Sequence, residues 1–218
     1  DSLRFAGETH LRNIKQLTFG GNNAEAYWSF DNKQLIFQSD WDKINPQGCD
    51  QIFIMNADGS NIIENERYRL VSTGKGRTTC SYFLKDGRIV YASTHMADEA
   101  CPETQMFVQG KYVWPIYNTY DIFAADSDGT NVELIIGGEG YDAEATASPD
   151  GKYIVFTSTR SGDLELWRYE IATKELLQLT DELGYDGGAF FSNDSKKIVW
   201  RASHPTGDDA ESYKELLS

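Results

Sequence analysis

The stretch Ser148-Pro-Asp-Gly-Lys-Tyr-Ile-Val-Phe-Thr-Ser158 decides the fold of this chain. Its Asp150-Gly151 pair predicts a tight turn, because glycine tolerates the positive φ that such turns require. The β-branched and aromatic run that follows the turn is typical of a buried strand. Residues 141–147, which precede the turn, predict a partner strand, so the whole stretch is expected to form a β-hairpin.

The same pattern occurs four times along the 218 residues. Each copy has a short strand, a turn centred on an aspartate, a lysine or arginine, and then a β-branched and aromatic run. The step between the last two turn aspartates matches the roughly 40–45 residues of a four-stranded propeller blade. The copies span residues 16–39, 77–93, 141–158 and 185–203, with turn aspartates Asp31, Asp86, Asp150 and Asp194.

Further strands complete the repeat. Third strands are predicted at 51–56, 120–125 and 165–170, and fourth strands at 68–72, 132–136 and 175–180. The sequence therefore predicts an all-β protein, a β-propeller of about four four-stranded blades in a single domain. The expected blades are residues 13–72, 73–136, 137–180 and 181–218, of which the last is incomplete.

Two features suggest that the ring is not complete within this chain. Residues 13–18 read as an outer strand without earlier strands of its own, and residues 210–218 read as a helix. An open arc of blades would leave unpaired strand edges. We therefore expect a full ring of six or more blades, closed by further C-terminal blades or by a second chain.

The repeat resembles that of the TolB-like β-propellers, which are also described as WD40-like Asp-repeat proteins. The resemblance rests on Ser148-Pro-Asp-Gly-Lys152, on the turn Asn56-Ala-Asp-Gly-Ser60 and on the Gln-Leu-Thr strand ends, and it covers nearly the whole chain. It implies a bacterial protein of the periplasm or cell exterior that acts as an interaction platform. The implied role is non-enzymatic binding of a protein, peptide or glycan.

The amino-acid composition limits the classes of partner that the chain is expected to bind. The formal charge of −14 argues against nucleic acid, which requires a basic surface, and against anionic lipid. No run approaches the roughly 18 apolar residues of a membrane-spanning helix.

The chain has no Gly-x-Ser-x-Gly, His-Glu-x-x-His or phosphate-loop motif, so no catalytic residue is nominated. The alternative is that the chain is the propeller portion of a hydrolase or lyase, either a peptidase gate or a metal-dependent enzyme.

The inner strands carry acidic residues eight and six positions before the turn aspartates. Because residues two apart on a strand point the same way, we expect them to line the mouth of a central channel. Oxygen ligands suit Ca²⁺ or another divalent cation, whereas the alternatives are a polar, water-filled channel or an organic ligand. The candidate binding residues of these strands are Asn23, Glu25, Asp142, Glu144 and Asp186, and the four acidic ones are the candidate metal ligands.

A second set follows the second strand of each repeat, on the same expected face: Trp41, His95, Arg160 and His204. An aromatic ring, two imidazoles and a guanidinium could recognise a peptide or sugar, and the histidines could hold a transition metal. Taken alone, each histidine is more often an ordinary residue of a surface loop.

Two insertions, residues 41–50 and 96–117, decorate this face. Long loops on a rigid scaffold often carry binding residues. Tyr112, Trp114 and Tyr117 are therefore candidate contact residues, unless they only pack the loop onto its own blade. All three cysteines, Cys49, Cys80 and Cys101, map to the same face, and the pair Cys80 and Cys101 is the favoured disulfide of the three possible ones.

Overall fold

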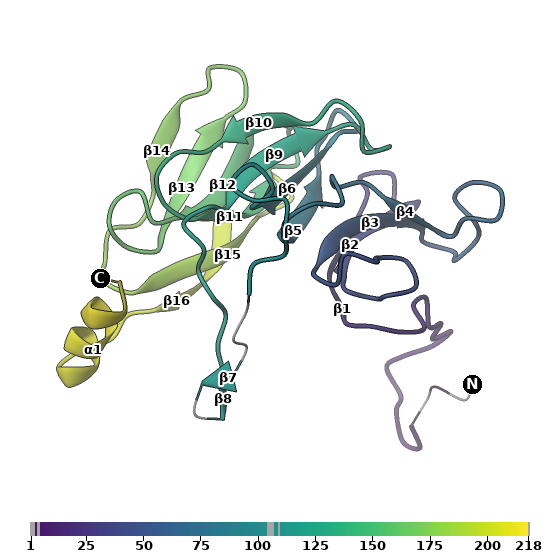
Figure 1. Ribbon diagram of the computed structural model, residues 1–218, viewed down its shortest axis with the longest axis horizontal. Coiled ribbons are helices and arrows are strands. Elements are labelled where there is room, and N and C mark those ends of the chain that lie inside the picture. The colour runs from purple at the N-terminus through teal and green to yellow at the C-terminus, as the bar shows by residue number, and fades with distance from the viewer. Residues whose placement is uncertain (1–2, 4, 104–106, 109, 218) are drawn as a thin grey trace.

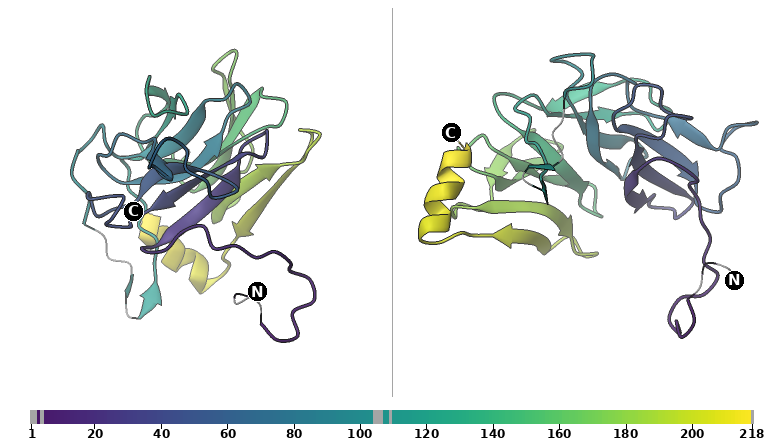
Figure 2. Two further views of the ribbon diagram at one scale, coloured as in Figure 1. Left: turned by 90° about the vertical axis from the view of Figure 1, so that its right-hand side faces the viewer. Right: turned by 60° about the horizontal axis from the view of Figure 1, so that its bottom comes forward.

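The computed structural model describes residues 3, 5–103, 107–108 and 110–217, and it consists of antiparallel sheets arranged as propeller blades (Figure 1). Three of the blade sheets have four strands and the fourth has two, and a further two-stranded sheet lies outside the blades. The sheets fan out in an open arc, with the first blade at one end and the two-stranded sheet at the other (Figure 2). The prediction of an all-β propeller built from four-stranded blades is confirmed.

The strands follow the predicted repeat closely. Blade 1 contains β1 (Asn23–Trp28), β2 (Gln34–Ser39), β3 (Gln51–Asn56) and β4 (Tyr68–Leu70). Blade 2 contains β5 (Thr78–Phe83), β6 (Ile89–Ser93), β9 (Asp121–Ala125) and β10 (Glu133–Ile136). Blade 3 contains β11 (Asp142–Ala147), β12 (Tyr153–Ser158), β13 (Glu165–Glu170) and β14 (Leu176–Gln178). Blade 4 contains β15 (Tyr185–Phe191) and β16 (Ile198–Ser203), followed by the helix α1 (Asp208–Leu217).

A small hairpin, β7 (Phe107–Val108) and β8 (Lys111–Tyr112), lies in the long connection between β6 and β9. It projects from the same side of the molecule as α1 and the N-terminal segment (Figure 1). The predicted insertion after the second strand of blade 2 thus forms an excursion from the blade rather than part of its sheet.

The first turn of each repeat is held by side-chain hydrogen bonds. In blade 3 the Ser148 hydroxyl donates to Asp150 at 2.7 Å, and the backbone N–H of Lys152 donates to both side chains. Ser29 with Asp31, and Ser192 with Asp194, repeat this arrangement. Such bonds replace the backbone partners that a tight turn leaves free, which explains why aspartate recurs there.

The hydrophobic core lies in the layers between neighbouring blades. Ile36, Ile52 and Ile54 of blade 1 pack with Phe83 and Ile89 of blade 2. A second layer joins blades 2 and 3, and a smaller one joins blades 3 and 4. The second and third strands of blades 1 and 2 are therefore buried on both faces and have nearly continuous apolar sequences, whereas β16 of blade 4 is mostly exposed.

The expected strand at 13–18 is not formed. Instead, Leu17 packs against the outer face of blade 1, and its carbonyl oxygen accepts a hydrogen bond of 2.7 Å from the Tyr68 hydroxyl. A fourth strand needs a third strand beside it, and blade 4 has only β15 and β16 in the part of the chain described. The segment therefore covers an apolar flank that would otherwise be exposed.

Candidate functional site

Every inner strand carries a β-bulge at the same position of the repeat. The pairing register shifts between Ala24 and Tyr27 in β1, and at the equivalent places in β5, β11 and β15. In each case one residue lies in the left-handed region, with φ between 48° and 60°. We call these the bulge residues: Glu25, Cys80, Glu144 and Gly188.

A bulge inserts one extra residue and re-aims the side chain that it carries. Glycine adopts a positive φ freely, whereas Glu25, Cys80 and Glu144 adopt it at a cost of roughly 1–2 kcal/mol each. Three strained residues at equivalent positions indicate that the direction of these side chains matters, since strain of this kind is concentrated at functional sites.

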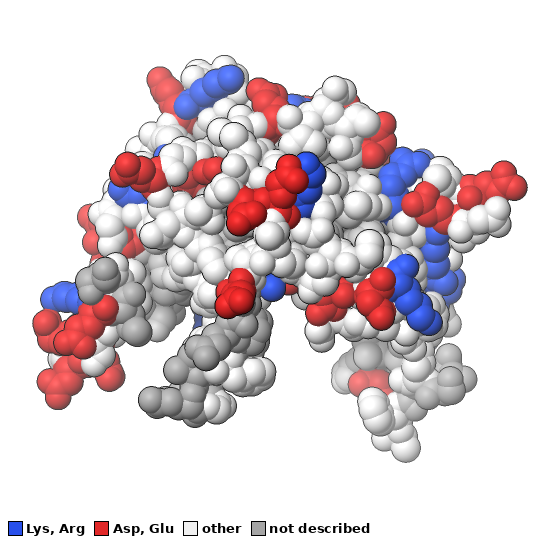
Figure 3. Space-filling model, viewed as in Figure 1, with Lys and Arg blue, Asp and Glu red and all other residues white. Residues whose placement is uncertain are grey.

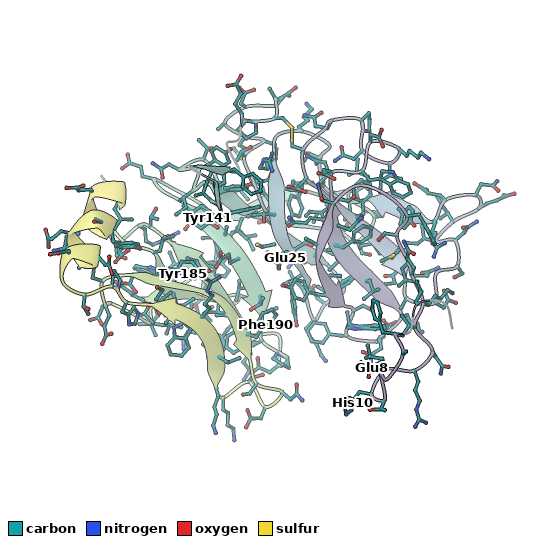
Figure 4. The ribbon with its side chains drawn as sticks, turned by 90° about the horizontal axis from the view of Figure 1, so that it is seen from below. Glu8, His10, Glu25, Tyr141, Tyr185 and Phe190 are labelled. Carbon is teal, nitrogen blue, oxygen red and sulfur yellow. A yellow bond between two sulfur atoms is a disulfide. The ribbon has the colours of Figure 1, made fainter. Side chains whose placement is uncertain are left out.

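The bulge residues of blades 1 to 3 border a cavity of about 550 Å³ at the centre of the arc, which we call the central cavity. Glu25, Tyr141 and Tyr185 surround this region when the molecule is seen from below (Figure 4). The cavity is lined by residues of all four blades and of the connection between β6 and β9: Ala24, Glu25, Gln38, Thr79, Cys80, Trp114, Ile116, Tyr141, Glu144, Leu164, Tyr185, Arg201 and Ser203.

Glu144 is held rigidly at the boundary between blades 3 and 4. Its carboxylate accepts hydrogen bonds from the Tyr185 hydroxyl at 2.9 Å, from the Thr157 hydroxyl at 2.8 Å and from the Gly188 N–H at 2.7 Å. A side chain at Gly187 would collide with this carboxylate, so the glycine is required for its close approach. Burial and the Glu144 charge both raise the pKa of Tyr185, which keeps its proton on the donor side of this bond.

Glu25, on β1, accepts a hydrogen bond from the Tyr27 hydroxyl. Tyr27 also belongs to an aromatic cluster formed by rings of three different blades. Its ring centroid lies 5.4 Å from that of Tyr82 in β5 and 5.5 Å from that of Phe190 in β15. All three residues stand four positions before a turn aspartate. Equivalent residues of blades 1, 2 and 4 are thus brought together by aromatic contacts.

The residues eight positions before the turn aspartates do not line the central cavity. Asp142 and Asp186 are buried, with 1% and 0% of their surfaces exposed. The bulge explains the difference from the expected arrangement, because the extra residue breaks the simple alternation of side chains along the inner strand. Asn23 donates to the Gly20 carbonyl at 2.9 Å and stabilises the loop before β1.

Asp142 and Asp186 are instead paired with the residues that follow the second strand of the same blade. The Arg160 guanidinium donates to Asp142 at 2.7 Å and also lies over the rings of Phe156 and Trp167. His204 lies 3.0 Å from Asp186, whose other oxygen accepts from the Trp200 indole at 2.7 Å. The structure thus pairs each of these inner-strand aspartates with the residue that was predicted to follow the second strand. Each pair lies within a single blade.

His204 also contacts Glu182 at 2.9 Å through its other ring nitrogen. Hydrogen bonding to Asp186 and the nearby negative charges raise the pKa of His204. His95 behaves in the opposite way, because burial and the charge of Lys75 lower its pKa. Its ring packs on Phe123 at 4.3 Å and contacts the Ser93 hydroxyl, so the two histidines lie in different environments.

The aromatic candidates are divided between packing and the cavity. Trp41 packs edge-on against Tyr68 and covers Gly20 and Gly21, within its own blade. Tyr117 donates to the Glu103 carbonyl at 3.0 Å and its ring contacts Tyr120. Trp114 alone of these three lines the central cavity. The side chain of Tyr112 lies outside the described residues.

The disulfide joins Cys49 and Cys101, not Cys80 and Cys101 as predicted. Cys49 and Cys101 lie in the two insertions, with Cα atoms 5.9 Å apart, so the bond ties the loop of blade 1 to that of blade 2. Cys80 is a bulge residue, and it is a free, half-buried cysteine that lines the central cavity. Burial, and then the charges of Glu144 and Glu25, raise the pKa of the Cys80 thiol.

Two absences concern only the part of the chain that the structure describes. It has no group of three or more His, Cys, Asp or Glu side chains placed to hold a metal ion. It also has no helix with the length and hydropathy needed to cross a bilayer. Charged side chains are spread over the face drawn in Figure 3, with acidic and basic groups often adjacent.

No family model matches the chain. A curated relative, the Tol-Pal system protein TolB of Francisella tularensis subsp. mediasiatica, is 30% identical over 100 residues, which is 45% of this chain and 23% of that protein. The chain thus matches about a quarter of the length of this relative.

Two solved structures have the same fold. TolB from Acinetobacter baumannii superposes with a TM-score of 0.60 at 21% identity, over 83% of this chain and 37% of that one. A putative TolB from Agrobacterium tumefaciens gives a TM-score of 0.60 at 19% identity, over 83% of this chain and 54% of that one. Repeat, sequence similarity and blade arrangement agree, and the chain has the β-propeller fold of these TolB structures, with its described blades in an open arc (Figure 2).

Proposed function

We propose that this chain is a non-catalytic binding propeller that recognises a peptide segment of a partner protein in the central cavity. The observation that supports it is the cavity itself, of about 550 Å³ and lined by residues of four blades. Its volume falls within the range of pockets that hold small ligands and side chains, and its mixed apolar and polar lining is typical of such sites. The similarity to Tol-Pal system proteins favours a protein partner over a glycan.

Rigid support of the lining favours recognition. Glu144 accepts three hydrogen bonds from two blades, and Glu25 accepts one from Tyr27. Side chains fixed in advance lose little conformational entropy when a ligand binds. The strain at the bulge residues is then the cost of directing these groups toward the ligand.

We also propose that the protein acts in the periplasm or outside a bacterial cell. The disulfide between Cys49 and Cys101 supports this location, because such bonds persist in oxidising compartments and are rare in the cytosol. The resemblance to TolB-like propellers points to the same place.

Peptide selection against the immobilised protein tests the binding role. Ala24 is exposed and lines the central cavity, so Ala24→Trp should block it while leaving strand β1 intact. The matched control is Ala172→Trp, in the exposed turn between β13 and β14. Selected peptides should bind the wild type and Ala172→Trp but lose at least about tenfold in affinity for Ala24→Trp. Equal binding to all three proteins would refute the central cavity as the site.

A further inference from the structure

Two carboxylates of the central cavity have only neutral partners. Glu144 accepts from a tyrosine hydroxyl, a threonine hydroxyl and a backbone N–H, and Glu25 accepts from the Tyr27 hydroxyl. Within the described ranges, neither of them forms an ion pair. By contrast, the chain provides Arg160 to buried Asp142 and His204 to buried Asp186.

The two carboxylates face the same space. They occupy the equivalent bulge position in blades 1 and 3, and Cys80 occupies it in the intervening blade 2. Both charges act on the Cys80 thiol, whose pKa they raise in addition to the effect of burial. Glu25 and Glu144 thus flank one central position, and their negative potentials add there.

The other lining groups suit an organic cation. Tyr141, Tyr185 and Trp114 line the same cavity, and the faces of aromatic rings attract ammonium and guanidinium groups. The single basic residue of the lining, Arg201, lies over the Tyr185 ring, with Cζ 5.8 Å from its centroid. Two carboxylates against one guanidinium leave the described lining with a net formal charge of −1.

We propose that the central cavity binds an ammonium or guanidinium group between Glu25 and Glu144. This inference rests on the proposed binding function and specifies the chemistry of the group that is recognised. Charge-assisted hydrogen bonds to carboxylates are stronger than neutral ones, and Glu25 and Glu144 keep acceptor capacity for them. The group can come from a lysine or arginine side chain of a partner or from a free alkylamine or alkylguanidine.

Three probes distinguish the charge and its source: the peptide acetyl-Ala-Arg-Ala-amide, the same peptide with neutral citrulline, and butylguanidinium. Titrations followed by calorimetry should show the arginine peptide binding at least about tenfold more tightly than the citrulline peptide. If a partner's side chain is the source, the arginine peptide also binds more tightly than butylguanidinium. If a free cation is the source, butylguanidinium binds as tightly as the peptide or more so.

Substitutions of the acidic and basic lining residues should change the affinity for the cation in opposite directions. Glu25→Gln should weaken cation binding about tenfold, and Glu144→Gln should do the same, whereas Arg201→Gln should strengthen it severalfold. Glu175→Gln, on an exposed carboxylate outside the cavity, is the control and should have no effect. Thermal melts of Glu25→Gln should match the wild type, because Glu25 is exposed and accepts one hydrogen bond.

Equal affinity for the arginine and citrulline peptides, or unchanged binding by Glu25→Gln, would overturn the inference, as would the absence of binding by all three probes. The proposed function fails separately. If the citrulline peptide binds the wild type as tightly as the arginine peptide does, and neither binds Ala24→Trp, the cavity is a peptide site without selectivity for cations. If selected peptides ignore the Ala24→Trp substitution, the cavity is not the site at all.

Discussion

The Tyr185 hydroxyl donates a hydrogen bond of 2.9 Å to the Glu144 carboxylate, and this contact joins the inner strands of blades 3 and 4. It also fixes a bulge residue whose φ of 59° is unfavourable for a glutamate. One bond thus links the packing of neighbouring blades to the position of a charged group in the central cavity.

Removal of this hydroxyl should destabilise the protein. Tyr185→Phe keeps the ring but deletes one donor to Glu144, so the free energy of unfolding should fall by about 1–3 kcal/mol. Urea denaturation measures the change. Tyr153→Phe, in the neighbouring blade 3 and away from the cavity, is the matched control and should cost less than about 0.5 kcal/mol. Equal effects of the two substitutions would contradict the role given to this bond.

Breaking the ion pair of Arg160 and Asp142 should lower the free energy of unfolding more than removal of the Tyr185 hydroxyl does. Asp142 is 1% exposed, so Arg160→Met leaves a buried carboxylate without its cation and should cost about 3–5 kcal/mol. Asp142→Asn combined with Arg160→Met should recover much of that loss, because the buried charge is then also removed. A double-mutant cycle by urea denaturation gives the coupling energy. The exposed pair Lys33 and Asp31 is the control, and its coupling should be much weaker because solvent screens both charges.

The disulfide should stabilise the face that carries the two insertions. The double substitution Cys49→Ser and Cys101→Ser should lower the free energy of unfolding by about 2–4 kcal/mol, since the bond closes a long loop of the unfolded chain. Unreduced protein should show one reactive thiol after denaturation and slow reaction of that thiol when native, because Cys80 is the free cysteine. Three reactive thiols, or rapid labelling of the native protein, would contradict this assignment.

Protonation of the turn aspartates should destabilise the protein in acid. Hydrogen bonds from Ser29, Ser148 and Ser192 lower the pKa values of Asp31, Asp150 and Asp194 below the usual 3.8. A lowered pKa in the folded state means that the stabilisation is complete above the unfolded value and disappears as pH falls through the folded one.

Replacement of these three aspartates by asparagine should therefore lower the melting temperature at neutral pH. The difference from the wild type should shrink as the pH falls through the lowered pKa of the folded state, because a protonated aspartate, like asparagine, carries no charge. Asp86→Asn is the control, because Leu84 replaces the serine in that turn. A difference that stays constant with pH would contradict the proposed origin of the pKa shift.

Local sequence signals predicted the blades well. Asp-Gly turns and β-branched runs act over a few residues, so the strands around Asp150 and the third strand 51–56 follow directly from them. The segment 13–18 has the sequence of a fourth strand but forms none, because strand formation also needs a partner that no local pattern provides.

The direction of the site residues depended on pairing between strands. Two-residue alternation predicted that Asp142 and Glu144 point the same way. The bulge in β11 breaks this alternation, so Asp142 is buried against Arg160 whereas Glu144 lines the cavity. The Cys49 pairing depends in the same way on where two insertions meet in space. The repeated dipeptides Tyr141-Asp142 and Tyr185-Asp186 were a signal for the two cavity tyrosines that sequence reasoning did not use.

The central claim is that the cavity between the bulge residues is the ligand site, and fluorine NMR tests it most directly. The chain has five tryptophans, and among them Trp114 lines the cavity whereas Trp41 packs on its own blade. In protein labelled with 5-fluorotryptophan, with Trp114→Phe and Trp41→Phe for assignment, a selected peptide should shift the Trp114 resonance saturably and leave that of Trp41 unchanged. A saturable shift of Trp41 with a fixed Trp114 resonance would contradict the account.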